Sequence, residues 1–469
     1  MSELIDLLKM RTIVLYIICA AVAVGGAGCS ATRECAKPEL NMPESFAHSD
    51  NDSLALADID WFEFYSDPAL RDILKATLAN NRDFLAAAAK VEELRNLYGV
   101  SAAAMLPEIG GHVYWSQETN DYRGEKHLTD PEHGIKARLN WEVDLWGNLR
   151  WGKKRDKAAW QASVEDQRAL QITLIAEAAS AYYRLVALDN ELLIVRQALD
   201  TRSEELEKAK LRYEGGLTSE IVYLQAQVEY NTAASLVPDV ERRISLTENA
   251  ILLLMGEYAG GKVVRSSGKL EQLPERPLPI GLPSELLTRR PDLRASEMRL
   301  CKALANVGVS YTDRFPKLTL GLTGGVENND IGGIFKSPFT YVIGSLTGPI
   351  FDFGKRKRKY KAAVAAYEQA RLGYEQDVMT AFGEVVDALT SYRKCRETTA
   401  SRADLRQAAE KYVELAHLQY RAGSINYLDV LDAQRRYLDS AIGFSNAVRD
   451  EMLSLVGLYK SLGGGWVTN

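Results

Sequence analysis

Two carboxylates in the C-terminal part of the chain have the spacing of a functional acid pair. Asp429 and Asp432 are three residues apart in the segment NYLDVLDAQ. Residues at that spacing share one face of a helix, so the pair could attract cations at a single surface. A second interpretation is that both acids are solvated at the start of a helix, where the helix dipole favours negative charge. The residues themselves leave both interpretations open.

No other set of side chains has the spacing of a catalytic or metal-binding site. The histidines show no HExxH or related pattern. His127 and His133 flank a predicted loop and could bind a metal, but solvated loop histidines are the more ordinary interpretation. We therefore expect no enzyme activity, no cofactor and no metal site.

Cys29 is a candidate for lipid modification. Lys9 and Arg11 precede an uncharged, mostly apolar segment over residues 12–27, and small residues follow it. This is the layout of a secretory signal peptide, which we assign to residues 1–28, with Met1 or Met10 as the start. Cys29 directly follows Gly26-Ala27-Gly28, which resembles a bacterial lipobox. The alternative is an ordinary cleaved signal with a coincidental cysteine.

The other cysteines of the processed chain are Cys35, Cys301 and Cys395. They are scattered and odd in number, with no CxxC pair. We therefore expect neither a disulfide framework nor a zinc site.

Composition narrows the class of protein. The formal net charge of -6 gives no reason to expect nucleic acid as a partner. Only one apolar stretch approaches membrane-spanning length, which excludes a polytopic helical membrane protein.

The chain contains an internal duplication. At an offset of 207, residues 211–227 (LRYEGGLTSEIVYLQAQ) align without gaps on residues 418–434 (LQYRAGSINYLDVLDAQ). Two such copies predict two structurally equivalent halves, a first repeat over 61–256 and a second over 283–465. Residues 257–282 are rich in Gly, Pro and Ser and indicate a linker, and residues 29–60 form an irregular N-terminal segment.

Each repeat is predicted to contain a helix, two strands, a very long helix, a tight turn and a further helix. Apolar and polar residues alternate over 135–145, which indicates a strand with two different faces. The other strands are expected near 109–119, 317–322 and 339–350. Residues 148–213 and 355–421 contain no proline, and a helix of such length would extend roughly 100 Å. The flanking helices of the first repeat are expected at about 68–105 and 218–255.

Four strands cannot span a membrane alone, because open edges leave backbone groups unpaired in hydrocarbon. Several protomers would have to combine their strands into one barrel, with apolar side chains toward lipid and polar side chains toward a lumen. The alternative is a soluble antiparallel sheet with one solvated face, which alternates in the same way.

Three segments resemble outer-membrane efflux proteins of the TolC-like family, in its lipoprotein (OprM/NodT-type) branch. They are LPSELLTRRPDLRASE (282–297), WFEFYSDPALRDILKATLANNRDFLAAAAKVEE (61–93) and YRAGSINYLDVLDAQRRYLD (420–439), in the family's order. The resemblance implies an α+β membrane protein, a homotrimer whose twelve-stranded β-barrel continues into a long α-helical periplasmic barrel. It further implies a lipid-anchored duct in the cell outer membrane that extends into the periplasm.

The same resemblance implies partners and site residues. The partners would be a periplasmic adaptor, an inner-membrane pump of the resistance-nodulation-division type, and outer-membrane lipid. The turns at Gly215, Gly216 and Gly423 would be the periplasmic tips that meet the adaptor. Asp429 and Asp432 would line a gate, with hydroxyls of Tyr213 and Tyr420 holding the tips.

Both junctions between strands and long helices are basic. The first carries Arg150, Lys153, Lys154 and Arg155, and the second carries Lys355, Arg356, Lys357, Arg358 and Lys359. Cations at a helix N-terminus oppose the dipole, so a compensating partner is expected. Anionic lipid is one such partner, with Trp146 and Trp151 as interfacial anchors; a solvated charge run is the other interpretation.

The leading hypothesis is therefore an exit duct for small molecules such as drugs or metal ions. An exit duct of a type I protein-secretion system and a non-channel coiled-coil envelope lipoprotein are the alternatives. The sequence does not identify the substrate.

Overall fold

The computed structural model describes residues 59–120, 128–266 and 283–466, together with Cys35, Pro38 and Pro43. The predicted signal peptide and Cys29 lie outside the described residues. The chain divides into two compact units, one centred on a sheet and one made of helices. Each unit contains parts of both sequence repeats, so the compact units differ from the repeats.

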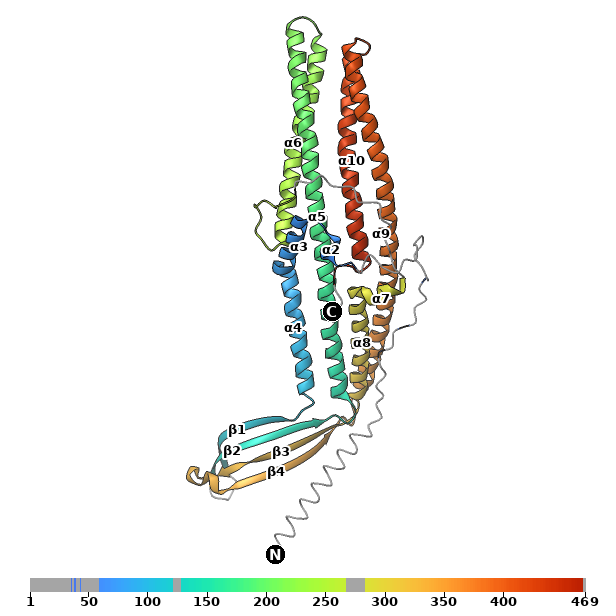
Figure 1. Cartoon of the computed structure of the whole chain (residues 1–469). Coiled ribbons are helices and arrows are strands. Elements are labelled where there is room, and N and C mark those ends of the chain that lie inside the picture. The colour runs from blue at the N-terminus through green and yellow to red at the C-terminus, as the bar shows by residue number, and fades with distance from the viewer. Residues whose placement is uncertain are drawn as a thin grey trace. The chain divides into compact units, whose positions relative to one another are not determined.

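The first unit contains a four-stranded antiparallel sheet in the order β1-β2-β3-β4 (Figure 1). Its strands are β1 (Glu108–Asn120), β2 (Leu128–Val143), β3 (Lys317–Asn328) and β4 (Pro338–Thr347). The central pairing joins β2 of the first repeat to β3 of the second, with Leu139 opposite Leu322. The four expected strands are confirmed. β2 begins at Leu128, inside the loop expected after β1, because backbone pairing with β1 continues that far.

The two faces of the sheet differ in polarity. Because side chains alternate along a strand, one face collects most of the apolar residues. Seven of them are between 41% and 76% exposed, namely Ile109, Val113, Trp115, Ile135, Leu322, Val342 and Leu346. The opposite face carries Lys136, Arg138 and Glu142 of β2, together with Phe339, Tyr341 and Ile343 of β4. The described residues leave much of the apolar face exposed.

Two helical hairpins dominate the second unit (Figure 1). The first is formed by α5 (Asn148–Glu214) and α6 (Glu220–Leu254), the second by α9 (Lys355–Arg421) and α10 (Tyr427–Ser461). α5 and α9 each contain 67 residues, which confirms the two very long helices. Their first turns belong to the sheet unit. Within the described residues, no helix combines the length and hydropathy needed to cross a bilayer.

Shorter helices complete the two units. They are α2 (Trp61–Phe64), α3 (Pro68–Asn80), α4 (Arg82–Ala103), η2 (Pro283–Glu285), α7 (Leu286–Arg289), α8 (Pro291–Thr312) and η3 (Ile331–Lys336). The predicted helix over 68–105 is divided into α3 and α4 at Asn81. The Asn81 side chain accepts hydrogen bonds from the backbone N–H of Asp83 and Phe84, each at 3.1 Å. Asn81 therefore caps a new helix, a role that its side chain favours.

The main core of the helical unit lies where α3, α5 and α6 meet. Leu70, Leu74, Leu185 and Ile251 are completely buried there. Leu185 lies near the middle of α5, whereas Tyr213 near the C-terminal end of α5 is 38% exposed. This face of α5 therefore changes from buried to half-exposed toward the tip.

A disulfide joins Cys35 to Cys301 of α8. The cysteine spacing, which led us to expect no disulfide framework, did not reveal this bond. The two cysteines are 266 residues apart, and no local spacing reveals which distant residues meet. Cys395 is a free thiol.

Candidate functional site

The two hairpin tips have the same turn geometry. At the first tip, the backbone N–H of Gly216 donates to Tyr213 O at 2.9 Å and that of Leu217 donates to Arg212 O at 2.8 Å. This is a Schellman motif, which needs a left-handed residue after the helix end. Gly216 has φ 72° and meets that need.

The second tip repeats this pattern around Gly423, which has φ 73°. Its N–H donates to Tyr420 O at 3.0 Å, and the Ser424 N–H donates to Gln419 O at 2.9 Å. Gly215, by contrast, precedes the left-handed position, and its own φ is not positive. Gly216 and Gly423 are thus the glycines that the turns require.

The two candidate gate aspartates have partners on their own helix. Asp429 Oδ2 accepts a hydrogen bond from Asn426 N at 3.1 Å and completes a capping box at the start of α10. Asp432 forms an ion pair with Arg436 at 2.7 Å. Both aspartates thus make contacts at the start of their own helix, as the second interpretation expects. The capping box uses one oxygen of Asp429 and leaves the other available for another contact.

The two candidate gate tyrosines differ in what they contact. The Tyr420 hydroxyl accepts a hydrogen bond from Arg212 Nη1 of α5 at 3.0 Å, which links the second hairpin to the first. The Tyr213 ring instead stacks on Tyr223 of its own hairpin, with centroids 5.8 Å apart. Tyr420 therefore connects the hairpins and Tyr213 does not.

A buried ion network connects the hairpins further from the tips, and the sequence analysis missed it. Glu229 of α6 lies 2.5 Å from Arg435 of α10 and 3.1 Å from Arg202 of α5. The side chains of Glu229 and Arg202 are only 6% and 5% exposed. An unpaired charge there would be costly, so the three residues depend on one another.

A second polar group lies beside this network. Gln434 Nε2 of α10 donates to Glu205 Oε1 of α5 at 2.7 Å and lies 3.3 Å from His417 Nε2 of α9. Burial, followed by the nearby charge of Glu205, raises the pKa of Tyr427. The repeat alignment already includes Gln434, at Ala433-Gln434. It does not show which residues of other helices Gln434 contacts.

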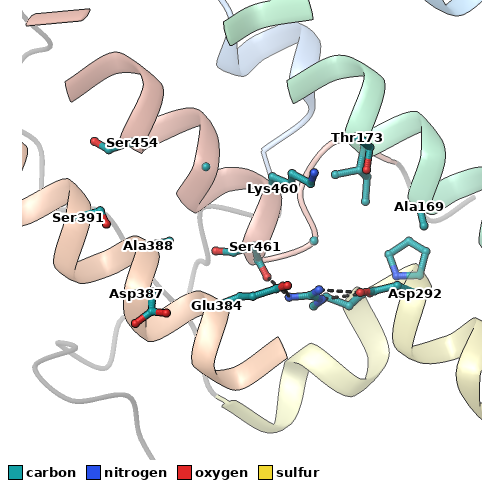
Figure 2. Close-up of a pocket in the computed structure, with 15 residues that line it drawn as sticks. Ala169, Thr173, Asp292, Glu384, Asp387, Ala388, Ser391, Ser454, Lys460 and Ser461 are labelled. Carbon is teal, nitrogen blue, oxygen red and sulfur yellow. Dashed lines mark hydrogen bonds and ion pairs between the residues drawn. The ribbon is translucent and has the colours of Figure 1, made fainter. Parts of the chain in front are cut away.

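The Arg-Arg-Pro-Asp segment organises a pocket of about 480 Å³ in the helical unit (Figure 2). Arg290 pairs with Asp292 at 2.6 Å and Glu384 of α9 at 2.7 Å, and it donates to Ser461 O of α10 at 3.2 Å. Burial disfavours the charged guanidinium, but the hydrogen bonds and charges of Asp292 and Glu384 together outweigh it and raise the pKa of Arg290. The segment therefore joins three helices.

Aspartates compensate the basic helix starts. Asp144 accepts hydrogen bonds from the backbone N–H of Leu149 and Arg150, at 3.1 and 2.9 Å. Asp352 accepts in the same way from Gly354 and Arg356, at 3.0 and 3.1 Å. A carboxylate at each N-terminus satisfies the free N–H groups and favours the dipole.

The basic side chains themselves fall into two groups. Arg150 pairs with Asp144 at 3.1 Å, and Lys359 pairs with Asp313 at 2.6 Å. Four others are exposed and make no ion pair with any described residue: Lys154, Lys355, Lys357 and Arg358. Only this second group is available for an external partner such as lipid.

The two tryptophans at the first junction also differ. Trp146 is 47% exposed, and its Nε1 donates to Pro316 O at 2.8 Å. Trp151 packs against α8, where Gly308 leaves room for its ring. Trp146 is therefore the more accessible of the two predicted anchors.

Comparison with known proteins gives one consistent group of similarities. Residues 73–257 and 282–464 match the family described as outer membrane efflux protein. The solvent efflux pump outer membrane protein SrpC of Pseudomonas putida is 31% identical over 454 residues, covering 94% of this chain and 96% of that protein. The cation efflux system protein CusC of Escherichia coli is 26% identical and covers 96% of this chain and 98% of its own. A membrane protein from Pseudomonas aeruginosa superposes with a TM-score of 0.86 at 27% identity, covering 93% and 100% of the two chains.

Proposed function

The chain belongs to the outer membrane efflux protein family, and from this premise we propose that it is the exit duct of a tripartite efflux system. Three copies would close twelve strands into a barrel in the outer membrane, and the helices would extend into the periplasm. There they would meet an adaptor and an inner-membrane pump of the resistance-nodulation-division type. Small molecules such as drugs or metal ions would pass through it without covalent chemistry.

The observation that carries this proposal is the two-faced sheet. Its apolar face is exposed, and among the described residues β1 and β4 each have one edge without a partner strand. Lipid suits the apolar face, but unpaired edges are not tolerated in hydrocarbon. Pairing β4 of one copy with β1 of the next removes both edges and leaves the polar face toward a water-filled path.

The test is conductance by the purified full-length protein in planar bilayers, together with its oligomeric state in detergent. We expect a heat-resistant trimer and stable single-channel currents. A monomer that leaves bilayers silent would contradict the duct and favour an envelope scaffold.

We further propose that Cys29 carries the lipid anchor. Support comes from the apolar segment and small residues that precede it. Mass spectrometry of the mature N-terminal peptide should find a diacylated Cys29, and Cys29→Ser should abolish that mass shift. An unmodified cysteine in the wild-type peptide would contradict the anchor.

Asp429 and Asp432 are proposed to narrow and charge the periplasmic end of the path. Their shared helix face supports this role, because three copies would bring six carboxylates around one axis. The double change Asp429→Ala and Asp432→Ala should raise single-channel conductance or weaken block by divalent cations. Because Asp429 also caps α10, Asp429→Asn with Asp432→Asn is the matched variant that conserves side-chain size. Unchanged recordings in both would contradict the gate.

A further inference from the structure

The polar face of the sheet contains a groove that runs along β3 and has a volume of about 610 Å³. Gly321 and Thr323 form its floor. Gly325 follows them on the same face of β3, so two of these three β3 positions have no side chain. At Gly325, an added Cβ would lie 2.3 Å from Ile135 O, so the close approach of β2 and β3 requires glycine there. The shape of this face therefore follows from the register of β2 and β3.

One wall of the groove is basic. Lys136, Arg138 and Asn140 of β2 line the groove. In the strand register they lie opposite these three residues of β3. Lys136 Nζ lies 4.0 Å from the centroid of the Tyr114 ring, which positions it beside the groove. Arg138 is exposed and has no hydrogen-bond or ion-pair partner among the described residues.

The acid at the end of the groove is already engaged. Glu327 Oε2 lies 3.0 Å from the hydroxyl of Tyr114, which also donates to Glu132 at 2.6 Å. Neither carboxylate is within ion-pair distance of Arg138. The basic wall thus presents two cations, and no acidic side chain of the described residues pairs with Arg138.

The opposite wall is aromatic and apolar. Phe339, Tyr341 and Ile343 of β4 pair with the same three β3 residues in register. Tyr341 is 57% exposed and Ile343 is 43% exposed, so neither is covered within the chain. Since neighbouring strands lie about 4.8 Å apart, the basic and aromatic walls are separated by roughly 10 Å.

We propose that this groove binds aromatic anions. A carboxylate or sulfonate would accept charge-assisted hydrogen bonds from Arg138 and Lys136, and a fused ring would cross the glycine floor to stack on Tyr341 and Phe339. The inference rests on the proposed function, because only a closed assembly makes this face part of the path. The open, solvated groove implies weak and rapidly reversible binding, as a duct requires.

The experiment measures block of single-channel current by 2-naphthalenesulfonate in bilayers that contain the purified full-length protein. We expect concentration-dependent block by this anion. Methanesulfonate, which has the charge without the ring, and 2-naphthalenemethanol, which has the ring without the charge, should block much less.

Two changes test the walls separately. Arg138→Gln should weaken the block at least about fivefold, as expected for one charge-assisted hydrogen bond in a solvated site. Tyr341→Leu should weaken it by a similar factor, whereas Tyr341→Phe keeps the ring and should retain it.

Lys317→Gln is the matched control. Lys317 lies on the same face but outside the groove and pairs with Glu142 at 3.0 Å. The change removes one positive charge without touching the groove, so block should persist. Equal weakening by Arg138→Gln and Lys317→Gln would show a general charge effect and overturn the site.

Failure of this site and failure of the duct give different results. Conducting trimers that 2-naphthalenesulfonate does not block would overturn the groove and leave the duct intact. Absence of conductance would contradict the duct. In that case, fluorescence titration of the detergent-solubilised protein with 2-naphthalenesulfonate, using the same variants, would test binding at the groove independently of conductance.

Discussion

Glu229 shows how much a single buried charge contributes to holding the two hairpins together. It lies between Arg202 and Arg435, and the Arg202–Glu229 pair is almost completely buried. Replacing one member of such a group leaves the others desolvated without a full partner. We therefore expect Glu229→Gln to lower the free energy of unfolding by about 3 kcal/mol, measured by denaturant titration of the solubilised protein.

The control for this change is Glu204→Gln. Glu204 pairs with Lys208, but the two side chains are 74% and 70% exposed. Water screens such a pair, so its loss should change stability by less than about 0.5 kcal/mol. Equal losses in the free energy of unfolding would contradict the conclusion that the buried network stabilises the fold more than the exposed pair does.

Asp313 connects stability to pH at the second junction. Burial raises its pKa, but the hydrogen bond from Lys359 opposes this, and the net pKa lies below the ordinary 3.8. A lowered folded pKa means that the ion pair stabilises the fold fully above about pH 4 and that this is lost as pH falls through the folded value.

Asp313→Asn should therefore lower the melting temperature at neutral pH, and the difference from wild type should shrink as the pH falls below 3.8. Thermal melts of both proteins across the acid range measure this. Lys359→Gln should also reduce the pH dependence. A difference between wild type and Asp313→Asn that stays constant down to the lowest pH would contradict this account.

At the scale of elements, the long helices begin with cations that the dipole disfavours, and aspartates on the preceding turns offset them. Asp144 and Asp352 perform this role in the two repeats. After this compensation, Lys355, Lys357 and Arg358 remain exposed without ion pairs among the described residues. Their free charge needs another explanation, and anionic lipid at the membrane face supplies one.

Reversing these charges tests that explanation. The triple change Lys355→Glu, Lys357→Glu and Arg358→Glu should reduce the yield of trimer in isolated outer membranes several-fold. Lys359→Glu is the control, because Lys359 already pairs with Asp313 and its change should act on stability instead. Normal membrane yield of the triple variant would exclude a lipid role for the cluster.

At the scale of the whole molecule, the disulfide connects the N-terminal segment to the sheet unit. Cys35 and Cys301 are joined, whereas Cys395 is free. If Cys29 is acylated, the denatured mature chain should react with maleimide at one cysteine before reduction and at three afterwards. Intact-mass measurement of the labelled protein counts them.

The same count separates two outcomes. Two labelled cysteines before reduction and four after it would show an unmodified Cys29 with the disulfide intact. Three labels without reduction would contradict the disulfide, and Cys301→Ser, which should expose Cys35 to the label, provides the reference.

The sequence alone determined the four strands, the long helices and their order. The alternation over 135–145, the proline-free segments 148–213 and 355–421, and the glycines of the tips each follow from local backbone and side-chain preferences. The duplication showed in addition that the pattern occurs twice. These features depend on residues close together in the chain, so their spacing carries the information.

Tertiary structure decided which distant residues meet. The network of Arg202, Glu229 and Arg435, the disulfide of Cys35 with Cys301, and the groove between Arg138 and Tyr341 each combine residues from separate elements. No spacing encodes such pairings, because they depend on strand register and on how whole helices pack. The division into a sheet unit and a helical unit, across both repeats, arises for the same reason: β2 pairs with β3 of the other repeat, and the two hairpins share one buried network.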